Sequence, residues 1–172
     1  MSLRNTELVS RLLVCLTLGL ALAACGEEIG DSCSLSTDCS STGSRICDTN
    51  SPGGYCTVIG CDVGTCPEEA VCVRFFPVTE SNRTCDPALE DVSQNFCTAD
   101  EICTIQQVCS PRNSEVRFCM RTCGSNGDCR SEYECRDTAG MQMYGGEPVP
   151  EAGEPTGSNT ERFCAAQAPT PQ

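Results

Sequence analysis

The chain has 172 residues with 18 cysteines, no histidine, no tryptophan and no lysine, and its formal net charge is −13. The lack of histidine excludes Ser-His-Asp and Cys-His nucleophilic catalysis, and no two cysteines have the C-x₂-C spacing of zinc sites. The acidic charge repels nucleic acid and anionic lipid head groups, so neither is expected as a partner on the basis of charge. We expect no enzymatic activity and neither a metal nor a cofactor.

Residues 1–24 are typical of a signal peptide. Arg4 and Arg11 precede residues 12–24, which carry no charge. As a helix this uncharged stretch is about 20 Å long, too short for a bilayer core of about 30 Å. Short length, basic flank and small terminal residues predict a segment that is removed after export.

The end of this segment, Leu22-Ala23-Ala24-Cys25, resembles the lipobox of bacterial lipoproteins. The resemblance implies that the Cys25 thiol receives a diacylglycerol, that the preceding peptide bond is cut, and that the new amino terminus is acylated, for example with palmitate. Three acyl chains exceed what stable membrane anchoring needs. The alternative is an ordinary secretory signal with a cysteine nearby by chance. Gly26 follows, not the aspartate that retains such proteins in the inner membrane, so the resemblance implies an outer-membrane protein facing the periplasm or the cell surface.

Cleavage would remove Cys15 and lipidation would occupy Cys25, which leaves an even number of cysteines for pairing. An exported, cysteine-dense chain is expected to form a disulfide framework. Its apolar residues come in short pieces, so bridges must supply much of the stability. The fold class predicted is small and disulfide-rich, with short β-hairpins and turns and little regular secondary structure. The predicted disulfide-forming residues are Cys33, Cys39, Cys47, Cys56, Cys61, Cys66, Cys72, Cys85, Cys97, Cys103, Cys109, Cys119, Cys123, Cys129, Cys135 and Cys164.

These sixteen cysteines form two sets of eight, within residues 33–85 and 97–164. The first seven cysteines of the two sets are offset by 62 to 64 residues, and such a fixed period marks a duplication. Residues 86–96 are predicted to link the repeats. Each repeat divides into two consecutive four-cysteine units, and four cysteines allow three pairings. We predict first-to-third and second-to-fourth bridges inside each unit, because the crossed arrangement braces both short loops, and we expect each repeat to fold by itself.

This cysteine spacing resembles the tandem cysteine-rich modules of bacterial surface lipoproteins and, more loosely, the amino-terminal cysteine-rich domain of Dickkopf proteins. "TDC" at Cys39 and "GDC" at Cys129 match the acidic residue that often precedes the second cysteine, whereas Thr65 and Ile102 depart from it. An aromatic residue precedes the fourth cysteine in three units, and we expect these rings to pack against a bridge. They are Tyr55, Phe118 and Phe163.

Other segments carry local signals. β-Branched and aromatic residues predict strands at 70–76 and 115–123, and "SPGG" at 51–54 predicts a turn. "PEEA" and "TADEI", at 67–70 and 98–102, have the acidic first turn that favours single helical turns.

Three further segments are expected to lie outside the modules. Residues 25–32 are predicted to form a lipidated acidic tether. Residues 137–161, rich in Pro, Gly and Glu, are predicted to form a mobile acidic loop, and 165–172 a disordered tail.

The sequence thus favours a lipid-anchored, non-catalytic envelope or surface protein. Its bridged modules would bind a protein or glycan ligand or hold structure. The alternative is an inhibitor of an extracellular protease, since small bridged modules present rigid loops well. "SPRNSEVRF", residues 110–118, is the one segment suited to that role.

Overall fold

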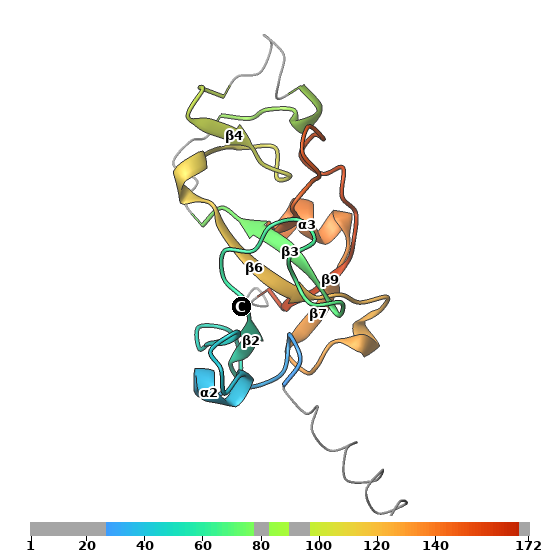
Figure 1. Cartoon of the computed structure of the whole chain (residues 1–172). Helices are drawn as coiled ribbons and strands as arrows, with labels where there is room; N and C mark the ends of the chain where they lie inside the picture. Colours follow the sequence, from blue (N-terminus) through green and yellow to red (C-terminus); the bar gives the residue numbers. More distant parts are fainter. Residues whose placement is uncertain (1–26, 78–82, 90–96, 169–172) are drawn as a thin grey trace, which may run out of the picture.

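The computed structural model describes residues 27–77, 83–89 and 97–168 (Figure 1). Four small antiparallel sheets, three of two strands and one of three, eight disulfides and two short α-helices make up this part of the chain, which confirms the small disulfide-rich fold. The strands are β1 (Ile46–Asp48), β2 (Tyr55–Thr57), β3 (Ala70–Phe75), β4 (Glu101–Cys103), β5 (Cys109–Pro111), β6 (Val116–Arg121), β7 (Tyr133–Arg136), β8 (Glu147–Pro148) and β9 (Phe163–Ala166). The helices are α2 (Ser36–Cys39) and α3 (Thr138–Tyr144), with 3₁₀ turns η2 (Pro87–Leu89), η3 (Arg112–Ser114) and η4 (Asn126–Asp128).

The sixteen cysteines from Cys33 onward form four modules with one plan. In each module the first cysteine is bonded to the third and the second to the fourth. The modules are A (Cys33, Cys39, Cys47, Cys56), B (Cys61, Cys66, Cys72, Cys119), C (Cys85, Cys97, Cys103, Cys109) and D (Cys123, Cys129, Cys135, Cys164).

The third and fourth cysteines of every module face each other across a strand pair. The register partners are Cys47↔Cys56 in β1–β2, Cys72↔Cys119 in β3–β6, Cys103↔Cys109 in β4–β5 and Cys135↔Cys164 in β7–β9. The Cα atoms of the first-to-third bridge lie 5.8 Å apart in all four modules. Each module therefore contains a two-stranded ribbon that is held by two crossed disulfides.

The predicted order of pairing is confirmed, but the predicted units are wrong in the middle of the chain. Cys66 is bonded to Cys119 and not to Cys85, while Cys85 is bonded to Cys103. The cause is strand pairing: β3 and β6 align from Ala70↔Arg121 to Phe75↔Val116, which puts Cys119 opposite Cys72.

Module C is consequently nested between the third and fourth cysteines of module B. The backbone of Cys85 joins module C because its N–H donates to the Gln107 carbonyl (3.0 Å), next to the bridge Thr84↔Val108. Two disulfides cross between the predicted repeats 33–85 and 97–164. The prediction that each repeat pairs only internally is wrong.

Modules A, B and D share a hydrogen bond between a side chain and the backbone near their first two cysteines. The residue before the second cysteine accepts a hydrogen bond from the backbone N–H of the residue after the first cysteine. The bonds are Ser34 to Asp38 (2.9 Å), Asp62 to the Thr65 hydroxyl (2.8 Å) and Gly124 to Asp128 (3.0 Å). Backbone donors hold the pKa values of Asp38 and Asp128 below their usual range. Thr65, which departs from the acidic pattern, plays the same part with a hydroxyl.

Most predicted local elements are found, with one consistent difference. β3 and β6 confirm the two predicted strands, and the Gly54 N–H donates to the Ser51 carbonyl (2.9 Å) in the predicted turn. The helical turns predicted at 67–70 and 98–102 are instead tight turns that lead directly into β3 and β4. An extended backbone there allows the next cysteine to face its ribbon partner.

Residues 137–161 are not an open loop. They contain α3 and β8, and β8 pairs with β3 through Val73↔Pro148 and Arg74↔Glu147. Met141 and Glu147 are almost fully buried. The predicted mobile loop is thus a structured insert between the third and fourth cysteines of module D, because it supplies side chains to the core and an edge strand to the sheet. The predicted tail likewise begins inside β9, and residues 169–172 lie outside the described residues.

The predicted tether is also part of the folded body from Ile29 onward. Ile29 is completely buried, the Gly30 N–H donates to the Cys56 carbonyl (2.9 Å), and the Cys56 N–H donates to the Asp31 carbonyl (2.9 Å). Gly30 has φ of +97°, and a Cβ there would lie 3.0 Å from the Arg121 Cβ, so this position requires glycine.

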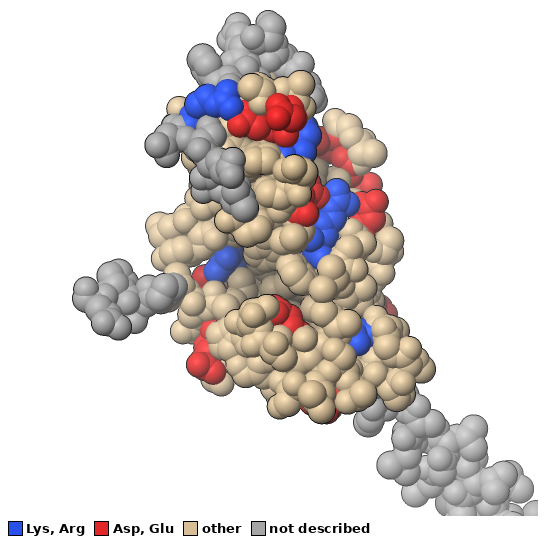
Figure 2. Space-filling model, turned by 90° about the vertical axis from the view of Figure 1, so that its left-hand side faces the viewer, with Lys and Arg blue, Asp and Glu red and all other residues tan. Residues whose placement is uncertain are grey.

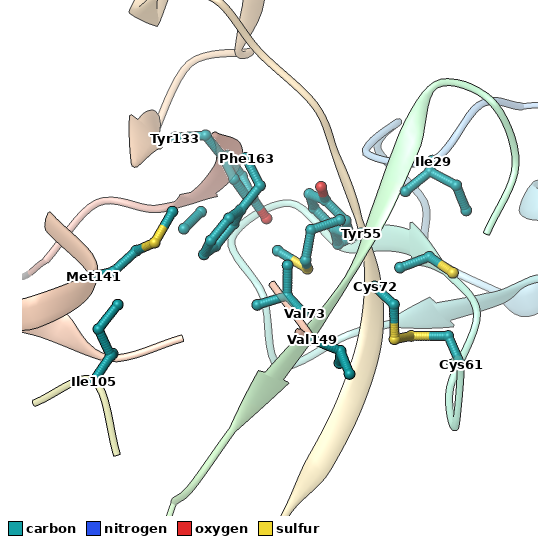
Figure 3. Packing of buried hydrophobic residues seen from close by; sticks show 13 residues of the cluster. Ile29, Tyr55, Cys61, Cys72, Val73, Ile105, Tyr133, Met141, Val149 and Phe163 are labelled. Carbon is teal, nitrogen blue, oxygen red and sulfur yellow. A yellow bond between two sulfur atoms is a disulfide. The ribbon is translucent and has the colours of Figure 1, made fainter. Parts of the chain in front are cut away.

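One hydrophobic core joins modules A, B and D (Figure 3). The rings of Tyr55 and Tyr133 stack with centroids 5.3 Å apart, and Phe163 meets Phe75 edge to face at 6.3 Å. Module C reaches this core through Ile105 and otherwise packs around its own cysteines. It is therefore an appendage on the β3–β6 ribbon, seen at the top of Figure 1.

Tyr55 makes the stability of this core sensitive to alkaline pH. Its hydroxyl accepts from the Arg121 N–H (3.0 Å), and burial raises the pKa of Tyr55 to about 12. Since a tyrosine in the unfolded chain titrates near about 10, the folded state holds a proton that the unfolded state releases. Folding stability should therefore fall as the pH rises from about 10 to 12.

We expect Tyr55→Phe to be less stable than the wild type at pH 8, because it loses the hydrogen bonds of the Tyr55 hydroxyl with the Arg121 N–H and the Cys164 carbonyl, but to lose less stability between pH 10 and 12. Urea unfolding at pH 8 and pH 11.5 measures both effects. Equal losses in the two proteins would show that Tyr55 does not titrate on unfolding.

Candidate functional site

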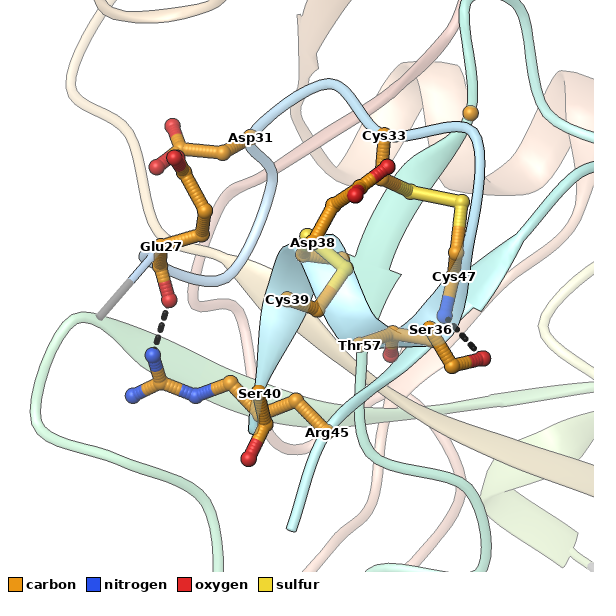
Figure 4. The surroundings of a disulfide bond; sticks show 12 residues. Glu27, Asp31, Cys33, Ser36, Asp38, Cys39, Ser40, Arg45, Cys47 and Thr57 are labelled. Atoms are coloured by element: carbon orange, nitrogen blue, oxygen red, sulfur yellow. Dashed lines mark hydrogen bonds between the residues drawn. A yellow bond between two sulfur atoms is a disulfide. The ribbon is translucent and has the colours of Figure 1, made fainter. Parts of the chain in front are cut away.

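The predicted lipidation residue, Cys25, lies outside the described residues, which begin at Glu27. The other predicted site residues, the sixteen cysteines, are all joined in disulfides. They bring sulfur atoms together in four places, where three sulfurs lie within 4.8 Å of one another. Each group belongs to two neighbouring disulfides, as Figure 4 shows around Cys33, Cys39 and Cys47. Metal binding and nucleophilic attack need a thiolate, whereas these sulfur atoms are joined in disulfides that stabilise the fold.

A cleft of about 490 Å³ opens where module C meets the rest of the molecule. Module B supplies Arg74 from β3 and Arg117 from β6, and module C supplies Ile102 and Arg112. The insert of module D forms the remaining wall with residues 149–154. The two inserted segments therefore meet over the ribbon of module B, and the cleft lies between them.

A buried ion pair fixes one wall of the cleft. Arg74 Nε lies 3.1 Å from Glu147 Oε1, and the two side chains are 7% and 1% exposed. The guanidinium also donates to the Thr156 hydroxyl (2.9 Å), while Glu147 accepts from the Gly157 N–H (3.0 Å). These bonds fasten the insert of module D to β3 at both ends of residues 147–157.

Arg117 is the register partner of Arg74 across β3–β6, and its side chain is partly exposed. It pairs with Glu115 and with Asp62, whose Oδ1 is 2.9 Å from Arg117 Nη1. Burial alone would lower the pKa of Arg117, but these two carboxylates outweigh burial and raise it. The guanidinium therefore keeps its charge and its place at the wall.

Basic and acidic side chains line the cleft in equal number. Three of the nine arginines that follow Cys25 line it, and so do the acidic residues Asp62, Glu151 and Glu154. Guanidinium groups donate to carboxylates in a fixed fork geometry, so this arrangement suits a ligand that carries acidic groups. On the face drawn in Figure 2, basic and acidic side chains alternate and do not gather in one broad patch.

The aromatic residues before the fourth cysteines are packed against other aromatic rings. Tyr55 and Phe163 are buried in the core, and Phe118 meets Phe75 edge to face at 6.1 Å. In the nested arrangement Phe118 precedes the fourth cysteine of module B, whereas Val108 precedes the fourth cysteine of module C.

Sequence reasoning missed the cleft. Arg74 gave a signal, because it is a charged residue inside the apolar stretch "AVCVRFF" and such a residue needs a partner when buried. Glu147 gave none, since it stands in a polar segment among glycines and prolines. The 110–118 segment proposed for protease inhibition is distributed over β5, η3 and β6, and Ser110 is fully buried.

Within the described ranges, no helix has the length and apolar character needed to cross a bilayer. Comparison of the chain with protein-family models, with curated proteins and with solved structures found no match.

Proposed function

We propose that this chain is a lipid-anchored cell-envelope protein without catalytic activity, which uses its disulfide-stapled modules for binding or for structure. The observation that carries the proposal is the pairing of the cysteines. All sixteen from Cys33 onward are bonded to one another, so Cys15 and Cys25 are the two cysteines of the given sequence that take no part in these bridges. Cys15 stands inside the proposed signal peptide, so Cys25 is available for the acylation that the lipobox resemblance implies. The same resemblance, with Gly26 after the cysteine, supports an outer-membrane location.

The cleft is the place on the described surface that best fits a binding role. It combines three guanidinium groups with the apolar side chains of Ile102 and Val149, and binding sites commonly join apolar walls with a few fixed polar groups. Its walls come from the inserts that distinguish modules B and D from the plain module A. We propose that it binds an acidic group of a protein or a glycan.

Protease inhibition has less support. A rigid inhibitory loop would have to protrude in an extended conformation, whereas residues 112–114 form η3 and the flanking residues are paired in β5 and β6. No observation on the described residues favours this alternative over envelope binding.

Metabolic labelling with a fatty acid tests the anchor. The wild type should be labelled and processed, whereas Cys25→Ser should be unlabelled and retain residues 1–24. Cys15→Ser is the matched control, because it alters a cysteine of the signal segment outside the lipobox, and it should be labelled like the wild type. Label in Cys25→Ser, or none in the wild type, would contradict the proposal.

A further inference from the structure

We propose that acylated Cys25 holds module A and the segment 27–31 against the bilayer, so that module C points away from the membrane at the opposite end of the molecule. This orientation rests on the proposed acylation of Cys25. In this orientation the surface formed by module A and residues 27–31 contacts the lipid head groups.

The segment that follows the acylation site is fixed to the body. Ile29 is completely buried, and its N–H donates to Glu69 (3.3 Å). Arg45 donates to the Glu27 carbonyl, as drawn in Figure 4, and Arg121 lies 2.8 Å from Glu28. The chain therefore cannot swing out from Glu27 onward without breaking these contacts.

The chain between the acylation site and the folded body is too short to act as a flexible tether. Gly26 is the single residue between Cys25 and Glu27. Consecutive Cα atoms are about 3.8 Å apart, so the Cys25 Cα lies within about 8 Å of the Glu27 Cα. The acyl glycerol on Cys25 must sit in the bilayer, which brings the surface around Glu27 to the head groups.

The charges of this surface are compatible with that contact. Arg121 is close to Glu28 and Asp31, and Arg45 is paired with Glu69 at 3.2 Å, so most of the local acidic groups have a basic neighbour. Glu27 and Asp31 lie side by side (Figure 4), and a hydrogen bond with Asp31 raises the pKa of Glu27.

Module C occupies the far end of the molecule. In Figure 1 the segment that begins at residue 27 and helix α2 of module A lie at the bottom, while β4 of module C lies at the top. A compact chain of this size is roughly 35 Å across, from a radius of gyration of about 14 Å. The cleft beneath module C would thus be presented to the surroundings and not to the bilayer.

Energy transfer to the membrane tests the orientation. A fluorescent amino acid is placed at exposed Ser41 in module A or at exposed Ala99 in module C. The acylated protein is reconstituted in phosphatidylethanolamine–phosphatidylglycerol vesicles that carry a head-group acceptor dye. We expect transfer from position 41 to be at least twofold more efficient than transfer from position 99.

A flexible insertion provides the control. Twenty Gly/Ser residues placed between Gly26 and Glu27 span about 25 Å on average and should bring the two efficiencies close together. Equal transfer without the insertion, or stronger transfer from position 99, would overturn the orientation. Intact mass of the reconstituted protein distinguishes two outcomes. Missing acyl chains would overturn the proposed anchor and the orientation with it, whereas acylated protein with equal transfer would overturn the orientation alone.

Discussion

Replacing residues 76–115 with Asn-Gly should yield a folded protein with six disulfides and no free thiol. Phe75 and Val116 are register partners in β3–β6, so a two-residue type I′ turn joins them without moving either strand. The deletion removes all four cysteines of module C together, along with both of its disulfides. The remaining body loses the buried side chain of Ile105, which costs on the order of 1.5 to 3 kcal/mol.

By contrast, the two sequence repeats, residues 26–90 and 91–172, should not fold with all their cysteines correctly paired when each is produced alone in an oxidising compartment. The first retains Cys66 and Cys85 without their partners, and the second retains Cys103 and Cys119. Each piece also loses the β3–β6 ribbon, which holds the centre of the sheet. We expect free thiols, mixed isomers or aggregates, read by alkylation and intact mass. Two repeats that each gave one disulfide isomer and unfolded cooperatively would contradict the nested arrangement.

The second large effect is expected at the buried ion pair. Glu147→Leu leaves the guanidinium of Arg74 buried without its carboxylate, and breaking such a pair costs roughly 3 to 5 kcal/mol. The double variant Arg74→Met with Glu147→Leu removes both charges and should recover most of that loss. Urea unfolding of the wild type, both single variants and the double variant gives the coupling energy.

A matched control for this cycle is the more exposed pair of Arg117 and Asp62. Asp62→Asn should change the free energy of unfolding by less than about 1 kcal/mol, because exposed pairs contribute little. If Glu147→Leu were no more destabilising than Asp62→Asn, the Arg74–Glu147 pair would have to be solvated and the insert of module D loosely held.

The sequence was sufficient for the features that depend on local chemistry. Cysteine density predicted the disulfide-rich fold, and the apolar stretches at 70–76 and 115–123 predicted β3 and β6. The order of pairing within a module was also predictable. The partner of Cys66 was not, because the pairing of β3 with β6 joins residues far apart in the chain.

The spacing of the cysteines in the sequence does not reveal that module C is nested inside module B, and the reason is physical. The entropy cost of closing a loop rises slowly with its length, so residues 73–118 can close between Cys72 and Cys119 nearly as well as a short turn could. A regular offset of 62 to 64 residues therefore records a pattern in the sequence without fixing which cysteines bond. Similarly, the burial of Ile29 and Glu147 depends on surfaces formed by distant strands, so neither residue could be placed from its neighbours.

Disulfide mapping tests the nested modules most directly. The unreduced protein is digested with pepsin at acid pH, where thiolate exchange is slow, and the linked peptides are identified by mass spectrometry. The structure predicts peptides that join Cys66 to Cys119 and Cys85 to Cys103. Peptides that join Cys66 to Cys85 and Cys103 to Cys119 would contradict it and would restore two independent repeats.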